Sequence, residues 1–248
     1  MVQVRQQSYF DATGGVDIQR WLGELPIVLE DTHRDLLAQA CEMAREVRGN
    51  PAVDTRDWAE ESDCLLTGLD MAQILVDLHV DPDCLAAAIL YRAVREERVT
   101  LEQIERRFGD NVSQLLRGVL RMAAIGDLPL NLDRPVLGQA HGQKDNVRKM
   151  LIALVDDVRV ALIKLAERTC ALRAVKDDER RRRQIGQEVF EVYAPLAHRL
   201  GIGQLKWELE DLSFRYIYAD AYRKIARLLD GKRLERDQFI QRVTGELS

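Results

Sequence analysis

The sequence predicts an all-α protein, and three observations support that prediction. Apolar residues recur at the three- and four-residue spacing of a helix face along most of the 248 residues. Capping residues and glycines mark the ends of these stretches. No segment shows the strict alternation of a β-strand, and no repeat of fixed period is present.

Helix starts in the N-terminal half are marked by capping residues. Thr32 to Asp35 has the pattern of a capping box, and an apolar stripe follows it from Leu36 to Val47. Asp81 is a favourable N-cap, and the proline after it suits the first helical position. Thr100 has a glutamine three residues later, which is a second capping box. The predicted helices cover residues 32–47, 65–78, 82–94, 100–109 and 111–125, with a polar loop at 53–62.

The C-terminal half is predicted to be helical after one long loop. Glycines and prolines without periodicity mark this loop at residues 126–143. The change from acidic to basic residues over 177–183 suits a helix start with a solvated basic face, and phosphate contact is the less favoured alternative. Gly201 and Gly203 end one helix before the next begins. Further helices are predicted from about residue 145, at 157–176, from 180, at 220–229 and on to 248.

The composition is that of a globular protein, for which we expect a cytoplasmic location. Apolar residues make up 46% and charged residues 31%, so a chain of this length can bury a sizeable core. The 36 basic and 41 acidic side chains give a formal charge of −5, which argues against a broad nucleic-acid-binding surface. No stretch reaches the ~18 apolar residues of a membrane span. The cysteines, which we expect to be small buried hydrophobes, are Cys41, Cys64, Cys84 and Cys170.

Motifs that carry known chemistry are missing from the sequence. It has no GxxxxGK(S/T) or GxGxxG phosphate loop and no HExxH metal motif. A metal site needs several convergent ligands, and no histidine lies within helical reach of another. The histidines are His33, His79, His141 and His198. The residues by themselves therefore predict a helical domain without a catalytic centre.

Two long segments resemble the N-terminal half of the RelA/SpoT family, whose members make and degrade the alarmone (p)ppGpp. Residues 145–168 read DNVRKMLIALVDDVRVALIKLAER, and residues 193–216 read YAPLAHRLGIGQLKWELEDLSFRY. Residues 85–118 resemble the preceding part of the family, most clearly in the run TLEQIERRFGD. The resemblance covers roughly residues 30–248.

The resemblance implies an HD-type helical hydrolase domain in which the metal ligands are lost. In the family, a His, a His-Asp doublet and a later Asp bind Mn²⁺ for removal of the 3′-pyrophosphate. The positions that match these four ligands are Thr67, Tyr91, Arg92 and Glu167, and the catalytic carboxylate pair matches Arg95 and Glu96. Threonine and tyrosine are poor Mn²⁺ ligands, and an arginine places a fixed positive charge in the site. The resemblance thus implies that no metal or other cofactor binds.

The family positions that would grip the nucleotide are also changed. Trp58 to Asp63 stands where a basic segment with Ser and Gly is expected, and Ala171 replaces a polar contact, although Arg168 persists. This pattern is typical of RelA-type members and implies an inactive, regulatory hydrolase-like domain. In such members the next domain is a GTP pyrophosphokinase of the stringent response, which transfers pyrophosphate from ATP to the 3′-hydroxyl of GDP or GTP. The implied partners are that synthetase domain and, through C-terminal domains beyond this chain, the ribosome and uncharged tRNA, but no membrane.

The predicted organisation is an N-terminal segment at residues 1–28, the hydrolase-like domain at 29–199, and a helical linker toward the synthetase region at 200–248. Two alternative functions stay open. Arg92, Arg95 and Arg168 would keep the remnant pocket basic enough to bind a guanosine nucleotide as an allosteric effector. The other alternative is a residual metal-dependent (p)ppGpp phosphohydrolase. We also expect Arg92 to occupy the space of the lost metal and to pair with Glu167, because a buried charge must be paired.

Overall fold

The computed structural model describes residues 15–48, 63–126, 157–175 and 179–229. This part of the chain is helical and contains no β-strand, which confirms the predicted fold class. The elements are α1 (Ile18–Glu24), α2 (Asp31–Glu46), α3 (Cys64–Val76), α4 (Pro82–Arg95), α5 (Leu101–Gly126), α7 (Val158–Ala174), α8 (Glu179–Glu188), the π-helix η1 (Val189–Tyr193), α9 (Ala194–Arg199) and α10 (Gly203–Ile217). A further helix covers 219–229.

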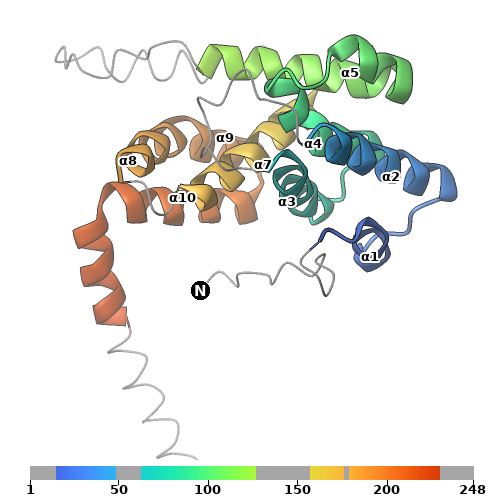
Figure 1. Ribbon diagram of the computed structural model, residues 1–248. Helices are drawn as coiled ribbons and strands as arrows, with labels where there is room; N and C mark the ends of the chain where they lie inside the picture. Colours follow the sequence, from blue (N-terminus) through green and yellow to red (C-terminus); the bar gives the residue numbers. More distant parts are fainter. Residues whose placement is uncertain (1–14, 49–62, 127–156, 176–178, 230–248) are drawn as a thin grey trace, which may run out of the picture.

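The helices form two groups that meet at α7 (Figure 1). In the first group, α4 packs against α2, α3, α5 and α7, and α3 also packs against α7. In the second group, α8, η1, α9 and α10 pack against one another, and α8, η1 and α10 also contact α7. The helix at 219–229 leaves the end of α10 at an angle and projects away from both groups. Helix α7 is therefore the element through which the two groups are joined.

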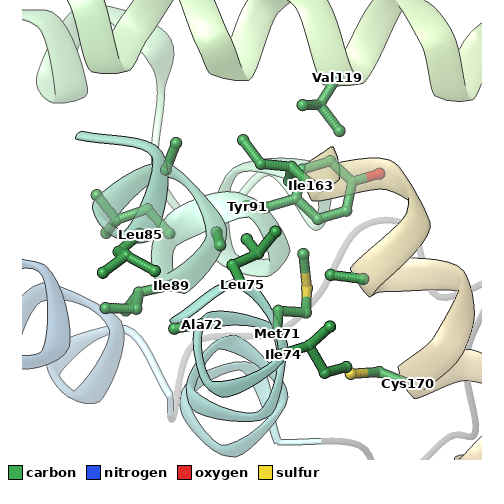
Figure 2. Close-up of a cluster of buried hydrophobic side chains, with 14 of the residues drawn as sticks. Met71, Ala72, Ile74, Leu75, Leu85, Ile89, Tyr91, Val119, Ile163 and Cys170 are labelled. Carbon is green, nitrogen blue, oxygen red and sulfur yellow. The ribbon is translucent and has the colours of Figure 1, made fainter. Parts of the chain in front are cut away.

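The first group is built around a close contact between α3 and α4. A Cβ atom at Gly68 of α3 would overlap the backbone of Ile89 in α4, so the two helices can approach this closely only with glycine there. Every residue of α4 from Cys84 to Val94 is buried, and three consecutive alanines keep this helix slim enough to be surrounded. Figure 2 shows Met71 and Leu75 of α3 in the resulting core.

Two of the predicted helix starts are confirmed and one is wrong. The Asp81 carboxylate accepts a hydrogen bond from the backbone N–H of Cys84 at 3.0 Å. Thr100 and Gln103 exchange hydrogen bonds of 2.9 and 3.3 Å, which completes the predicted capping box. The capping box expected at Thr32 does not form, because α2 already begins at Asp31 and its N-cap residue makes no side-chain cap. The acidic residue in the first turn complements the helix dipole instead.

The predicted glycine breaks have a direct backbone cause. Gly109 has φ 85° and ψ 177°, which are not helical angles, and it kinks α5 between the two helices that the sequence predicts there. Gly201 has φ 73° at the end of α9, where the N–H of Ile202 donates to the carbonyl of Ala197 at 3.0 Å. Both conformations favour glycine, because a positive φ is strained for residues that carry a Cβ atom.

Two local features were not predicted. Helix α1 begins at Ile18, is capped by Asp17, and buries Trp21 against the core. The π-helix η1 ends two residues before Pro195, whose ring and missing N–H disturb the regular hydrogen-bond ladder. The predicted elements at 53–62, 127–156 and 230–248 lie outside the described residues.

The four cysteines behave as predicted. All are buried and none forms a disulfide. Burial raises the pKa of Cys41 and of Cys84 to about 12, so these thiols stay protonated and act as small apolar side chains. Within the described ranges, no helix has the length and apolar character needed to cross a membrane.

Candidate functional site

Arg92 and Glu96, two positions of the predicted site, form a buried charge cluster at the end of α4. Arg92 has a side chain only 2% exposed, and its Nε lies 2.6 Å from Oε1 of Glu96, one helical turn later. Arg98 also pairs with Glu96. Arg98 donates through Nη1 to the carbonyl oxygens of Val47 and Arg48, at 3.2 and 3.0 Å. The cluster therefore ties the end of α4 to the end of α2.

A second buried charge cluster is centred on Glu167 in α7. Its Oε2 lies 2.9 Å from Nζ of Lys164, and Arg168 contacts both carboxylate oxygens, with Nη2 at 2.6 Å from Oε1 and Nε at 2.7 Å from Oε2. The remaining side of Arg168 reaches Glu188 of α8, with an Nη1–Oε2 distance of 3.2 Å. This cluster therefore links the two helix groups.

The charges in this cluster shift one another's pKa values. Burial disfavours the charged form of Glu167, yet Arg168 and Lys164 overcome it and lower the pKa of this carboxyl to about 2. Burial and the neighbouring Arg168 lower the pKa of Lys164 below its ordinary range. The aromatic ring of Tyr193 lies 5.9 Å from each of the two cations, and burial together with Glu188 raises the pKa of this tyrosine. Glu167 is therefore a carboxylate at neutral pH.

Thr67 and Tyr91, the other two positions matched to metal ligands, are buried between helices. Thr67 precedes Gly68 on α3, at the close contact with α4. Tyr91 is 1% exposed, and Figure 2 shows its ring close to Ile163 of α7. Tyr91 is also among the groups that raise the pKa of Tyr193, after burial and Glu188. The structure thus places Tyr91 next to the Glu167 cluster.

The expected pair between Arg92 and Glu167 is wrong. Arg92 pairs with Glu96 on its own helix, and Glu167 is held by Lys164 and Arg168 on its own helix. Helical geometry accounts for the pairs Arg92–Glu96 and Lys164–Glu167, since residues three or four positions apart meet on one face without any contact between helices. Arg168 reaches the carboxylate of Glu167 from the next position in the chain. Each buried charge is still paired, as the expectation required, but the partners are local.

The side chains matched to metal ligands do not fit Mn²⁺. Hard divalent cations prefer carboxylate, imidazole and carbonyl ligands, whereas Thr67 offers a hydroxyl and Arg92 only donors. Both oxygens of Glu167 already face cations. In the described ranges, no three His, Cys, Asp or Glu side chains are placed to hold a metal ion.

The three arginines expected to contact a nucleotide differ in their access to solvent. Arg168 is only 3% exposed and is neutralised by two carboxylates, and Arg92 is equally buried. Arg95 is half-buried. Ala171 is buried in α7, and residues 58–62 of the expected gripping segment lie outside the described part of the chain. Arg92 and Arg168 are therefore both paired with carboxylates inside the protein.

Four residues of these clusters were missed at the sequence level. Lys164 and Glu188 supply counter-charges, Tyr193 supplies an aromatic surface, and Arg98 connects α4 to α2. A signal for Lys164 was available, because Lys164, Glu167 and Arg168 interrupt the mostly apolar middle of α7 at the i, i+3, i+4 spacing of one face. No comparable signal marks the contacts between helices, which depend on tertiary packing.

Comparison with known proteins gives one family and several relatives. Residues 40–203 match the HD domain family. The chain is 39% identical over its full length to a GTP pyrophosphokinase of Escherichia coli K12, of which it covers 32%. It is 36% identical over 99% of its length to a GTP pyrophosphokinase of Photobacterium angustum, of which it covers 31%.

The chain is also similar to a relative that is named for hydrolysis. Over 71% of its length the chain is 37% identical to a guanosine-3′,5′-bis(diphosphate) 3′-pyrophosphohydrolase of Vibrio cholerae, of which it covers 24%. The chain spans about a third or less of the length of these relatives.

Proposed function

We propose that this chain, which belongs to the HD domain family and is homologous to the RelA/SpoT-type GTP pyrophosphokinases, is a hydrolase-like domain without hydrolytic activity that regulates a (p)ppGpp synthetase. The parent protein would transfer pyrophosphate from ATP to GDP or GTP in a separate domain. The ribosome and uncharged tRNA would be further partners of this parent protein.

The observation that carries the proposal is the state of Glu167. It is the one carboxylate left among the four positions matched to metal ligands, and Lys164 and Arg168 hold both of its oxygens at 2.6–2.9 Å. A bound Mn²⁺ would have to displace at least one of these cations from a fully buried site. Breaking such a buried pair costs about 3–5 kcal/mol. The loss of three ligands and the pairing of the remaining carboxylate with two cations therefore both support a domain that does not bind Mn²⁺.

The similarity to a pyrophosphohydrolase supports the alternative of residual hydrolysis. That reaction needs a metal-bound hydroxide, and the described residues offer no group of three His, Cys, Asp or Glu side chains that could hold the ion. The nucleotide-binding alternative has support from the half-buried Arg95. It is weakened by Arg92 and Arg168, whose charges are balanced by buried carboxylates. We therefore place both alternatives below a regulatory domain.

A hydrolysis assay tests the first part of the proposal. The purified chain is incubated with ppGpp and Mn²⁺, beside the Vibrio cholerae pyrophosphohydrolase as a positive control. We expect pyrophosphate release at the background level and no stoichiometric binding of Mn²⁺ in calorimetry. Release above background that depends on Mn²⁺ would contradict the proposal.

The regulatory part needs the full-length parent protein. Replacing Glu188 by Gln weakens the link between the two helix groups while leaving Glu167 paired with its own helix. We expect a changed rate of (p)ppGpp synthesis and unchanged substrate affinity. Equal synthesis rates in the variant and the wild type would remove the support for regulation through this cluster.

A further inference from the structure

The helical turn between α8 and α9 holds one residue more than a regular α-helix would. In η1 the backbone N–H of Ala194 donates to the carbonyl of Val189, five residues back instead of four. Helix α8 ends where η1 begins and α9 begins where η1 ends, so residues 179–199 form one helical run with a single π turn. Such turns are rare inside α-helices and are frequently found at functional sites. The contacts at the two ends of η1 indicate what holds this turn in its π form.

The π turn brings Glu188 and Tyr193 to the same side of the helical run. The Oε2 of Glu188, just before η1, lies 3.2 Å from Nη1 of Arg168, and the ring of Tyr193, at the end of η1, lies 5.9 Å from the same guanidinium. In a regular α-helix of about 3.6 residues per turn, positions five apart point about 140° away from each other. A turn that spans five residues brings them back toward one side. The π turn thus lets both side chains reach the Glu167 cluster on α7.

The apolar residues of this run also fit an uninterrupted α-helix. One apolar stripe has the four-three-four spacing of a regular helix face and consists of Ile185, Val189, Val192 and Leu196. All four are also buried in the π form. Pro195 has no N–H for the carbonyl four residues back, so a regular helix gains one hydrogen bond fewer here. The apolar face therefore does not select one form, and the contacts with α7 can decide between them.

We propose that η1 is a register switch, held in its π form by the contacts of Glu188 and Tyr193 with the Glu167 cluster. When the contact between Glu188 and Arg168 is lost, the turn relaxes to a regular α-helix. Helix α9 then turns relative to α8 by the angle of one residue, which is about 100°. Helix α10 packs against both α8 and α9, so its position responds to this turn. The switch is a property of this chain, and its use in regulation rests on the proposed function.

The two forms differ in the exposure of the residue that follows η1. Ala194 is 1% exposed in the π form. In a regular α-helix continued from α8, Ala194 would lie nine positions after Ile185, on the side opposite the apolar stripe. Val192 would lie seven positions after Ile185, on the apolar side, and it is buried in the π form too. The variant Ala194→Cys therefore reports the register, and Val192→Cys reports general loosening of the fold.

Thiol labelling of the full 248-residue chain tests the switch, and its four native cysteines give a low background because they are buried. Glu188→Ala removes the contact with Arg168, and we expect it to speed the labelling of Ala194→Cys at least about tenfold. The labelling of Val192→Cys should stay nearly unchanged. Unchanged labelling of Ala194→Cys, or equal acceleration at both positions, would overturn the proposal.

Deletion of Phe190 tests the register without removing a contact to α7. Phe190 lies in η1 and is 38% exposed. Without it, Glu188 and Tyr193 are four positions apart, and a regular α-helix places them on one side. We expect this variant to fold and to protect Ala194→Cys from labelling. The protection should persist when Glu188→Ala is added, because no extra residue remains to be released.

Deletion of Gln114 is the matched control, since Gln114 is an exposed residue in the regular part of α5. It should strongly lower the melting temperature, because the turn before it is rotated out of the core. A Phe190 deletion that is as damaging as this control would show that η1 holds no surplus residue and would overturn the proposal. Such a failure would leave the proposed function untouched, because neither hydrolysis nor synthesis is measured.

Discussion

Arg92 illustrates how much of a buried site can be predicted one residue at a time. Its burial and its need for a counter-charge both follow from its position in an apolar helix, where an unpaired charge is costly. The choice of partner does not follow, because the expected partner was Glu167 on another helix, whereas the observed one is Glu96, one turn away. Local geometry decided between them. Residues of its own helix likewise supply the partners of Glu167, which are Lys164 and Arg168.

A pair of double-mutant cycles should distinguish the two partners of Arg92. Arg92→Ala leaves the buried Glu96 with Arg98 as its remaining cation, so it should lower the free energy of unfolding by less than the ~3–5 kcal/mol of a completely broken buried pair. Adding Glu96→Ala should cost less than the sum of the two single changes, since both members of the 2.6 Å pair are then gone. Adding Glu167→Ala instead should be additive. The measurement is urea unfolding of each variant, and coupling between positions 92 and 167 would show that the pairing is misassigned.

Ser113 is a buried hydroxyl with no hydrogen-bond partner among the described residues. An unsatisfied buried polar group costs about 1–3 kcal/mol, so Ser113→Ala should raise the free energy of unfolding by about 1 kcal/mol. Ser213 is an equally buried helix serine whose hydroxyl donates to the carbonyl of Leu209. Ser213→Ala is therefore the matched control and should give no gain. Thermal melting measures both, and equal shifts would mean that the hydroxyl of Ser113 is satisfied.

At the scale of elements, the ends of helices were predictable wherever one residue type fixes the backbone. Asp81 marks the start of α4 as expected, because its carboxylate caps free N–H groups. Gly201 marks the end of α9 as expected, because glycine accepts a positive φ. The start of α2 was misplaced because the pattern after Thr32 satisfies the same rule two residues after the observed N-cap, Glu30. The short helix α1 was missed because seven residues carry too little periodicity.

Gly109 gives a test of the kink in α5. A Cβ there would meet no atom within 4 Å, so any cost of Gly109→Ala comes from the backbone angles of φ 85° and ψ 177°. Such angles are nearly restricted to glycine, and we expect a loss of stability of about 1–3 kcal/mol. Gly23→Ala is the control, because Gly23 also has open space but lies in helix α1, where alanine gains up to about 1 kcal/mol. Chemical denaturation of both variants should give opposite signs, and a neutral Gly109→Ala would show that α5 can straighten.

At the scale of the whole molecule, resemblance gave the family and the fold, and the HD domain match over residues 40–203 confirms the family. The way in which α7 joins two helix groups did not follow from the sequence. That link depends on Arg168 reaching Glu188 twenty positions later, and on Tyr193 facing two cations from a π-helix. Contacts of this kind are set by packing, for which single-sequence patterns carry no signal.

Restoring the family's four metal ligands would test whether the residues around them also oppose metal binding. In a variant with Thr67→His, Tyr91→His, Arg92→Asp and Glu167→Asp, we expect little or no hydrolysis of ppGpp with Mn²⁺. Arg92→Asp places a second carboxylate beside the buried Glu96, and like charges there disfavour folding.

The other substitutions meet obstacles of the same kind. Thr67→His must fit beside Gly68, where the backbones of α3 and α4 are already in contact. Glu167→Asp shortens the carboxylate that holds Lys164 and Arg168 and leaves both cations close to the site. The measurement is pyrophosphate release, with thermal melting to verify folding and the Vibrio cholerae pyrophosphohydrolase as reference. A folded variant with turnover near that reference would mean that the four ligands alone were lost and that the surrounding clusters do not oppose the metal.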